Sequence, residues 1–123
     1  MTVIQTTCLI ETPIYINNNK SYIDISLYNS DAEHVKKTQE SSEHMLRGSR
    51  VQDPLHGATL KVKVPMRNGR TLCAMTGQKP LCAMVKGDKI DVKITYCGPW
   101  NYGDFCGFAW KLNQVGLSTI DYR

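Results

Sequence analysis

The stretch KGDKIDVKITYCGPWNYGDFCGFAWKLNQV, residues 86–115, decides the fold because it predicts two strands in succession. Residues 89–96 alternate apolar and polar side chains, which is typical of a strand with one buried face. Residues 97–104 hold two glycines and a proline, which predict a turn. In the part that follows, one parity forms the side that we expect in the core: Cys106, Phe108, Trp110 and Leu112.

Shorter stretches of the same kind lie earlier in the chain. Residues 21–28 alternate cleanly, and three asparagines at 17–19 predict the turn before them. Residues 59–75 predict a hairpin around an Asn-Gly dipeptide, which favours a type I′ turn. The apolar residues 81–85 predict one more short strand. Many short strands with glycine and proline turns are typical of a mainly β domain, a small barrel or a sandwich.

One segment, residues 29–57, interrupts this β pattern because it is polar and poor in β-branched residues. Ser30 and Glu33 have the spacing of a capping box, so we expect a helix over residues 31–47. A length of 123 residues suits a single domain. We therefore predict one domain over residues 1–123, with a helical insertion at 29–57.

Positive charge is concentrated in the second half of the chain. The net charge is +4, and residues 57–100 carry eight basic side chains against Asp88 and Asp91. A local positive field favours a polyanionic partner. A surface whose charge only keeps the protein in solution explains the same pattern, so charge alone leaves both interpretations open.

The second face of residues 105–113 indicates the chemistry of such a partner. Gly107 and Ala109 predict a shallow floor on which a flat group approaches the backbone. Phe105 lies at one end of this floor, and Lys111 lies at the other end, where it is placed to meet a negative charge. A nucleobase with its phosphate has these properties.

Cations and aromatic rings recur together on the polar faces and in the turns of the other predicted strands. In a groove for single-stranded nucleic acid, basic side chains follow the backbone while bases stack on the rings. Tyr22 and Tyr28 have an alternative role, because either ring could instead pack over a neighbouring strand or over the helix. The residues that we predict to bind nucleic acid are Tyr22, Tyr28, Lys61, Lys63, Arg67, Arg70, Lys89, Lys93, Trp100, Tyr102, Phe105 and Lys111.

Residues 86–115 also resemble the C-terminal part of OB-fold single-stranded DNA-binding proteins of large DNA viruses and phages. The resemblance rests on Gly87-Asp88 before a hydrophobic strand and on residues of the last strand, namely Gly107, Phe108, Trp110, Lys111 and Leu112. It implies an OB-like β-barrel, which we expect to hold six or seven strands with the helical insertion. It also implies sequence-independent binding of single-stranded DNA that protects single strands during replication or recombination.

Other functions find less support in the sequence. The chain holds no P-loop, dinucleotide fingerprint or Cys–His motif, so we expect no enzyme activity, no catalytic residue, no cofactor and no metal site. Its five cysteines are spaced unlike a zinc site or a disulfide framework, and we expect buried, reduced thiols. A small β-barrel that acts as a structural or assembly protein through protein–protein contacts stays open as an alternative.

The expected partners follow from this interpretation. We expect single-stranded DNA, or RNA, as the ligand, and self-association into a homo-oligomer. The first residues lack a basic segment followed by a long apolar run, and no stretch has the length of a membrane span. We therefore expect an intracellular protein, in the cytoplasm or the nucleus, with no membrane partner.

Overall fold

The computed structural model describes residues 2–77 and 79–118. Five strands form a closed barrel, in the order β1 (Val3–Asn17), β2 (Lys20–Ser26), β5 (Thr59–Val64), β10 (Phe105–Leu117) and β9 (Lys89–Tyr102). β9 pairs back with β1, which closes the circle. Neighbouring strands are antiparallel except β5 and β10, which are parallel. The predicted mainly β, OB-like barrel with one helix is confirmed.

Three short strands extend the sheet of the barrel, which therefore holds eight strands within the described residues, compared with the expected six or seven. β3 (Arg50–Gln52) and β8 (Ala74–Thr76) pair with β10, and β4 (Leu55–His56) pairs with β5. β6 (Met66–Arg67) and β7 (Arg70–Thr71) form a separate two-stranded sheet. Within residues 2–77 and 79–118, the helical elements are α1 (Asn29–Glu40) and two 3₁₀ turns, η1 (Glu43–Met45) and η2 (Leu81–Ala83).

The core of the barrel is built from the inward faces of its strands. On β9, Ile90, Val92 and Ile94 are buried, as the alternation predicts. The expected inward face of β10 is also buried and consists of Cys106, Phe108, Trp110 and Leu112. Because successive side chains of a strand point to opposite faces, the polar neighbours of these residues are directed to the outside.

The start of α1 differs from the prediction, because the capping box of Ser30 and Glu33 is not formed. Tyr28 occupies the N-cap position, and no side chain of the described residues caps the helix there. Asp31 stands in the first turn, where a carboxylate is stabilised by the helix dipole. Its Oδ2 accepts a hydrogen bond from the hydroxyl of Thr6 at 2.6 Å, which fastens the helix to β1.

The end of α1 also differs, because the helix stops at Glu40 instead of residue 47. The hydroxyl of Ser41 donates to the carbonyl of Thr38 at 2.6 Å, and that of Ser42 donates to the carbonyl of Gln39 at 3.3 Å. These bonds add donors to carbonyls of the last turn, where the regular helical hydrogen bonds end, and the Gln39 carbonyl also accepts the backbone N–H of Ser42 at 3.1 Å. The chain then leaves the helix axis and continues toward β3.

The strand predicted for residues 81–85 is wrong. These residues hold η2 instead, and Leu81 and Met84 are only 1% and 2% exposed. Side chains three positions apart lie on the same side of a 3₁₀ turn. The turn therefore inserts both apolar side chains into the core, which a strand with alternating faces does not do.

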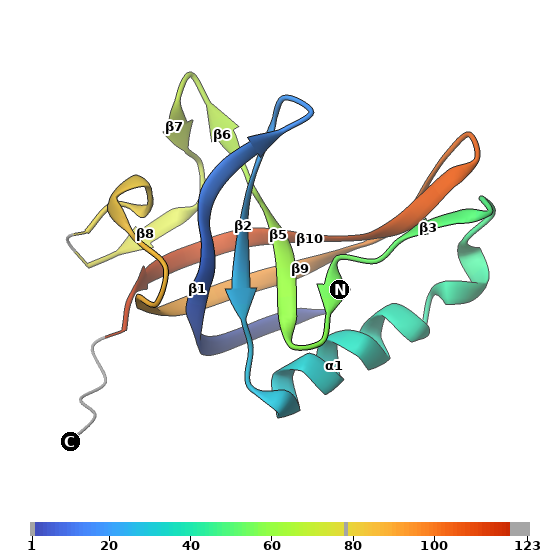
Figure 1. Ribbon diagram of the computed structural model, residues 1–123, viewed down its shortest axis with the longest axis horizontal. Coiled ribbons are helices and arrows are strands. Elements are labelled where there is room, and N and C mark those ends of the chain that lie inside the picture. Colours follow the sequence, from blue (N-terminus) through green and yellow to red (C-terminus); the bar gives the residue numbers. More distant parts are fainter. Residues whose placement is uncertain (1, 78, 119–123) are drawn as a thin grey trace.

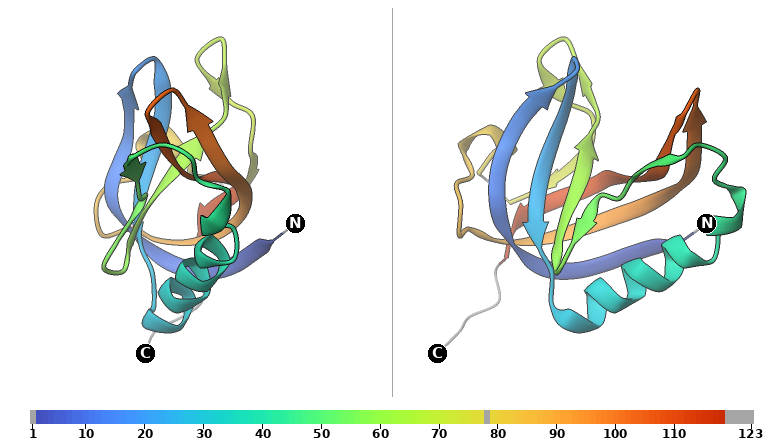
Figure 2. Two further views of the ribbon diagram at one scale, coloured as in Figure 1. Left: turned by 90° about the vertical axis from the view of Figure 1, so that its right-hand side faces the viewer. Right: turned by 45° about the vertical axis from the view of Figure 1, so that its right-hand side comes forward.

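The turn predicted for residues 97–104 is also wrong in its first part, because β9 continues to Tyr102. Gly98 has a φ of +85°, and the register with β10 shifts at this point. Such a bulge bends a strand without ending it. Beyond the bulge, β9 and β10 leave the barrel as a hairpin with β3 alongside (Figures 1 and 2). We call residues 97–107 the arm.

The cysteines are all free thiols, but only three of them are buried. Cys8, Cys73 and Cys106 lie inside, whereas Cys82 and Cys97 are exposed, so the expectation of buried thiols is wrong for these two. Burial raises the pKa of the Cys8 thiol to about 12. This thiol therefore stays protonated and packs as a small apolar group.

Candidate nucleic-acid interface

One residue from each barrel strand forms a row around the outside of the barrel, which we call the belt. The strand register places the five members side by side in the order Tyr15, Tyr22, Lys63, Lys111 and Thr95. Cross-strand neighbours on one face are close enough for their side chains to interact. The belt therefore brings together three of the predicted site residues, which are Tyr22, Lys63 and Lys111.

The first half of the belt is aromatic. The ring centroids of Tyr15 and Tyr22 lie 5.9 Å apart, and the Nζ of Lys61 lies 4.3 Å from the Tyr22 centroid. The Tyr15 hydroxyl donates to Oδ1 of Asp24 at 2.7 Å. Partial burial and then this hydrogen bond raise the pKa of Tyr15. In the free protein, the predicted phosphate ligand Lys61 is thus held on the Tyr22 ring as a cation–π pair.

Two of the last three belt residues are basic, and the third, Thr95, is buried. β5 and β10 pair in parallel at Lys63 and Lys111, and we call this point the seam. Both lysine side chains are exposed. Across the part of the chain that the structure describes, neither lysine takes part in a salt bridge. Two like charges therefore stand next to each other without a carboxylate between them.

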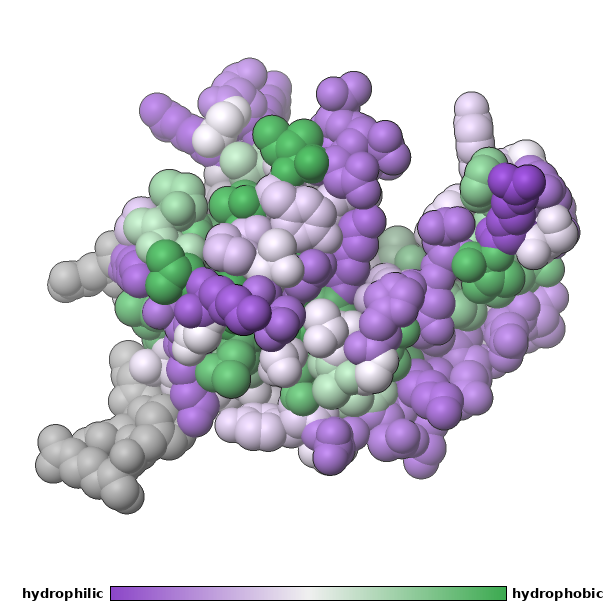
Figure 3. All heavy atoms as spheres, in the orientation of Figure 1, coloured by the Kyte–Doolittle hydropathy of each residue, from purple (hydrophilic) through white to green (hydrophobic). Residues whose placement is uncertain are grey.

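The surface beside the seam is hollowed. Figure 3 shows the hollow between the bulk of the barrel and the arm, which rises as a separate projection. β5 and β10 cross on the barrel side of this hollow (Figure 1). An extended ligand that lies in the hollow therefore contacts the seam and the arm together.

The floor that the sequence predicts at Gly107 is not open. Gly107 is buried, and a Cβ there would collide with the carbonyl of Gln52 on β3. It would also meet Cζ2 of Trp100 at 3.0 Å. The flat group above Gly107 is thus the protein's own Trp100 ring. Trp100 is half-buried, and it is less accessible to a ligand than the sequence predicts.

Two exposed rings lie at the tip of the arm. Tyr102 and Phe105 are direct cross-strand partners and are 81% and 42% exposed. The guanidinium carbon of Arg50, on β3, lies 5.5 Å from the Phe105 centroid. Its Nε lies 3.7 Å from Oδ2 of Asp104 in an exposed ion pair. The tip therefore presents two ring faces with one cation beside them.

The arm is held by the strap, residues 42–49, which connects α1 with β3. The Oδ1 atom of Asn101 accepts a hydrogen bond from the backbone N–H of Arg47 at 2.7 Å. Its Nδ2 donates to the carbonyl of Met45 at 3.1 Å. One side chain on β9 thus bonds to two backbone groups of the strap and fixes the position of the arm.

The strap also contacts the arm at its tip. The carboxylate of Asp104 accepts hydrogen bonds from the hydroxyl and the backbone N–H of Ser49, at 2.7 and 3.3 Å. These bonds, the hydroxyl first, hold the pKa of Asp104 below its ordinary value. A Cβ at Gly48 would collide with the backbone carbonyl of Asp104, so only glycine allows this close approach.

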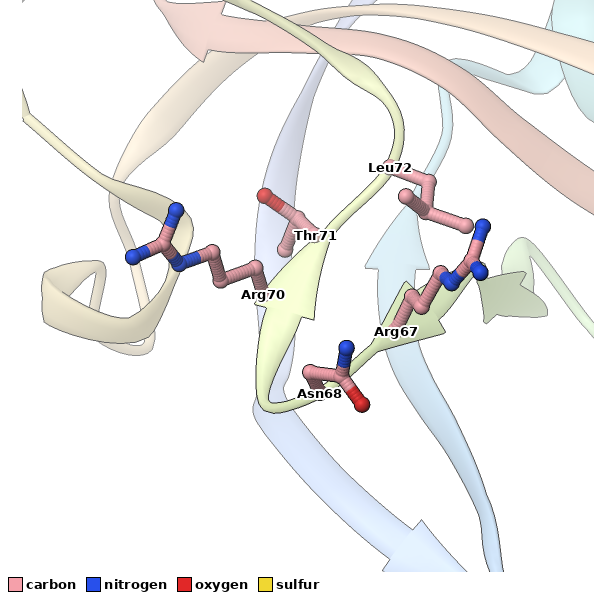
Figure 4. A pocket seen from close by; sticks show the side chains of 5 residues that line it. All are labelled: Arg67, Asn68, Arg70, Thr71 and Leu72. Atoms are coloured by element: carbon pink, nitrogen blue, oxygen red, sulfur yellow. The ribbon is translucent and has the colours of Figure 1, made fainter.

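The β6–β7 hairpin presents two further predicted cations, Arg67 and Arg70. Asn68 and Gly69 have φ angles of +51° and +75°, which confirms the predicted type I′ turn between them. The two arginines line a shallow pocket with Leu72. Figure 4 shows the guanidinium of Arg67 beside Leu72, whereas Arg70 points away from it. The hairpin therefore directs its two charges to different sides.

Two predicted site residues, Tyr28 and Lys89, lie apart from the belt and the arm. Tyr28 occupies the N-cap position of α1, outside the barrel strands. Lys89 is the first residue of β9, six positions before the belt residue Thr95. Asp91 follows on the same face and accepts a hydrogen bond from the Thr7 hydroxyl at 2.6 Å. Lys93 is only two positions before Thr95 on that face, so the structure places this lysine beside the belt.

Three residues of this surface were missed in the sequence. Tyr15 lies before the Asn turn, and a register between the two flanking strands would have placed it beside Tyr22. Arg50 lies in the polar segment that we expected to be an insertion, where no local signal marks β3. Asn101 lies in the predicted turn, so its role in fixing the arm had no counterpart in the sequence pattern.

Comparison with known proteins yields no relative: no protein family model, curated protein or solved structure matches the chain. Among residues 2–77 and 79–118, no three histidine, cysteine, aspartate or glutamate side chains are grouped so that they can hold a metal ion. No helix in these ranges has the length and apolar composition needed to cross a membrane.

Proposed function

We propose that the protein binds single-stranded nucleic acid, with DNA as the principal ligand, along the surface that runs from Tyr22 across the seam to the arm. The observation that carries the proposal is the belt. A tyrosine ring lies next to Lys63, and Lys63 lies next to Lys111, with no salt bridge to either lysine among the described residues. Phosphates supply the missing negative charge, and bases supply flat groups for the rings.

The place of this surface in the barrel supports the proposal. OB-fold proteins bind oligonucleotides on the face of their second and third strands and with the loops between strands one and two and between strands four and five. Here these strands are β2 and β5, and the loops are the β1–β2 turn and the tip of the arm. This is an analogy at the level of the fold, so the chemistry of the site rests on the belt and the arm themselves.

The exposed rings of the arm favour a single strand over a duplex. A base offers its flat face to Tyr102 or Phe105 only after it has left the stack of a double helix. Stacking accepts every base, because every base has a π face, and each stacked base contributes about 1–3 kcal/mol. The surface therefore binds without reading the sequence.

Binding of this kind suits a protein that covers single strands during replication or recombination inside the cell. Cooperative binding along the strand is common for such proteins and accompanies the self-association that we propose. The alternative, an assembly protein, draws on the exposed side chains of the arm and β3, where Val51 is 52% exposed. Salt distinguishes the two, because phosphate contacts weaken as salt rises and apolar association does not.

Titration of labelled oligo-dT, oligo-rU and duplex DNA of one length at two salt concentrations tests the proposal. We expect oligo-dT to bind more tightly than the duplex, with an affinity that falls as salt rises. Lys111→Gln should weaken this binding, whereas Lys36→Gln, on the exposed side of α1, should not. Equal affinity for duplex and single strand, or association that strengthens with salt, would contradict the proposal.

A further inference from the structure

Lys63 and Lys111 lie on adjacent strands, directly opposite each other. They are register partners in the parallel pair of β5 and β10, and such strands lie about 4.8 Å apart. The residues on both sides of Lys63, Val62 and Val64, are buried, and Leu112 next to Lys111 is buried as well. Both lysine stems are therefore directed outward, side by side, from neighbouring strands.

The proximity of the two lysines lowers the stability of the protein when no ligand is bound. Like charges directly opposite each other on neighbouring strands are destabilising. An acidic residue on the same face of β2, Asp24, is the register partner of Lys61 and accepts a hydrogen bond from the hydroxyl of Tyr15. Nothing in the described part of the chain forms an ion pair with either seam lysine. An anion from outside the chain would offset the repulsion.

We infer that Lys63 and Lys111 together form one subsite for a single phosphate group. This inference rests on the proposed function and deepens it, because it assigns both lysines to the same phosphate of the bound strand. Two ammonium groups on flexible stems reach two oxygens of one phosphate, as each carries three donors. The strand then crosses the seam at this phosphate, with Tyr22 on one side and the arm on the other.

The slope of oligo-dT affinity against salt concentration reports how many phosphates the protein neutralises. Each phosphate neutralised on a single strand contributes about 0.7 to the slope of log affinity against log salt. We expect the double variant Lys63→Gln/Lys111→Gln to reduce the slope by about 0.7, and the two single losses of affinity to add to more than the double loss. A reduction of about 1.4, with additive losses, means two separate phosphates and overturns the inference. No change in slope overturns it too.

The double variant Lys36→Gln/Lys37→Gln on α1 is the matched control, because it removes the same charge from two adjacent exposed lysines. We expect it to leave the slope and the affinity at the parent values. A control that reduces the slope as much as the seam variant would show that net charge, and no subsite, governs binding.

Inorganic phosphate tests the subsite without nucleic acid. At constant ionic strength, we expect phosphate to raise the Tm of the parent more than that of the seam double variant. In phosphate-free buffer each single Gln variant should have a Tm about 1–4 °C above the parent, because the repulsion is gone. Equal phosphate shifts in parent and double variant overturn the inference, whatever the oligonucleotide does.

The two experiments separate the inference from the proposed function. Suppose that the parent does not bind oligo-dT, but that phosphate raises the Tm of the parent more than the Tm of the double variant. The proposed function then fails, and the anion subsite stands. If oligo-dT binds and the double variant changes the slope by about 1.4, the function stands and the shared subsite fails.

Discussion

The arm and the β6–β7 hairpin both project from the barrel and both carry predicted site residues, yet they are built in different ways (Figure 1). The arm is formed by two long strands of 14 and 13 residues: β9 runs from the barrel into the arm, and β10 begins at the tip and runs back into the barrel. It has β3 as a third strand and the strap as a hydrogen-bonded support. The hairpin consists of two strands of two residues each, which form a sheet of their own.

This difference indicates that the arm holds its side chains in fixed positions, whereas the hairpin lets its side chains adapt to the ligand. Rings bind with less loss of entropy when the backbone that carries them is fixed beforehand, and β3 and the strap hold the backbone that carries Tyr102 and Phe105. Arginine on a small hairpin keeps long-range attraction for phosphate while it adapts to the path of the strand. We therefore expect the arm to determine affinity for bases, and the hairpin to contribute mainly a salt-dependent term.

The largest effect should come from Trp110, a core residue on the part of β10 that belongs to the barrel. Its ring is 1% exposed, and its Nε1–H donates to Oε1 of Gln39 at 3.0 Å, which attaches α1 to β10. Trp110→Ala should lower the free energy of unfolding by about 3–5 kcal/mol through the cavity left behind. Trp110→Phe, which keeps a ring but leaves Gln39 without its donor, should cost about 1–3 kcal/mol. Urea denaturation measures both, and a Trp110→Ala protein as stable as the parent would contradict the assignment of faces on β10.

The next effect concerns the exposed ring at the tip. Tyr102→Ala should weaken oligo-dT binding by about 1–3 kcal/mol with an unchanged salt slope, because stacking is lost and no charge is removed. The thermal stability should stay at the parent value, since the side chain is 81% exposed. Tyr102→Phe is the control and should bind like the parent. A Tyr102→Ala variant with full affinity would remove the tip of the arm from the site.

A smaller effect is expected from Asn101, which positions the arm through the strap. Asn101→Ala removes two hydrogen bonds and should lower stability by about 1–2 kcal/mol. Hydrogen exchange should become faster in the strap, and oligo-dT affinity should fall although the salt slope stays the same. Asn101→Asp keeps the acceptor for the Arg47 N–H and should show about half of each change. Unchanged exchange in residues 42–49 would mean that the strap does not depend on this side chain.

The smallest effect should come from the β6–β7 hairpin. Arg67→Gln and Arg70→Gln should each change stability by less than about 0.5 kcal/mol, because both side chains lie on the surface. Each variant should reduce the salt slope of oligo-dT binding by about 0.7 if its guanidinium meets one phosphate. If these variants lost more affinity than Tyr102→Ala at equal salt, the hairpin and not the arm would determine affinity.

The barrel was predictable from the sequence because its signals are local. Alternation placed Ile90 and Trp110 inside, and the Asn turns at 18–19 and 68 have the positive φ angles that their composition favours. The seam was not predictable, although both of its lysines were named, because the register partners 63 and 111 are 48 positions apart in the sequence. No local pattern states which strands close a barrel.

The contacts that define the arm were missed for a related reason. A bulge at Gly98 lets β9 continue where glycine and proline predict a turn, so the arm looked like a loop. The segment that looked like a surface insertion supplies both the strap and β3. Its helix has a thin apolar stripe, but the buried Gln39 bonds Trp110 and also Asp53, at 3.0 and 3.1 Å. The buried Gln39 therefore attaches the helix to the barrel together with the buried Ala32 and Val35 of that stripe.

The pairing of β1 with β9 has a consequence for synthesis on the ribosome. Residues 3–9 of β1 find their partners at 89–95, so one edge of the first strand has no neighbour while most of the chain is being made. The core also stays open until β10 joins β5. Unpaired strand edges and exposed apolar faces make nascent chains prone to aggregate. The yield of this protein in cells should therefore depend on translation speed and chaperone supply more than that of a helical protein of equal stability.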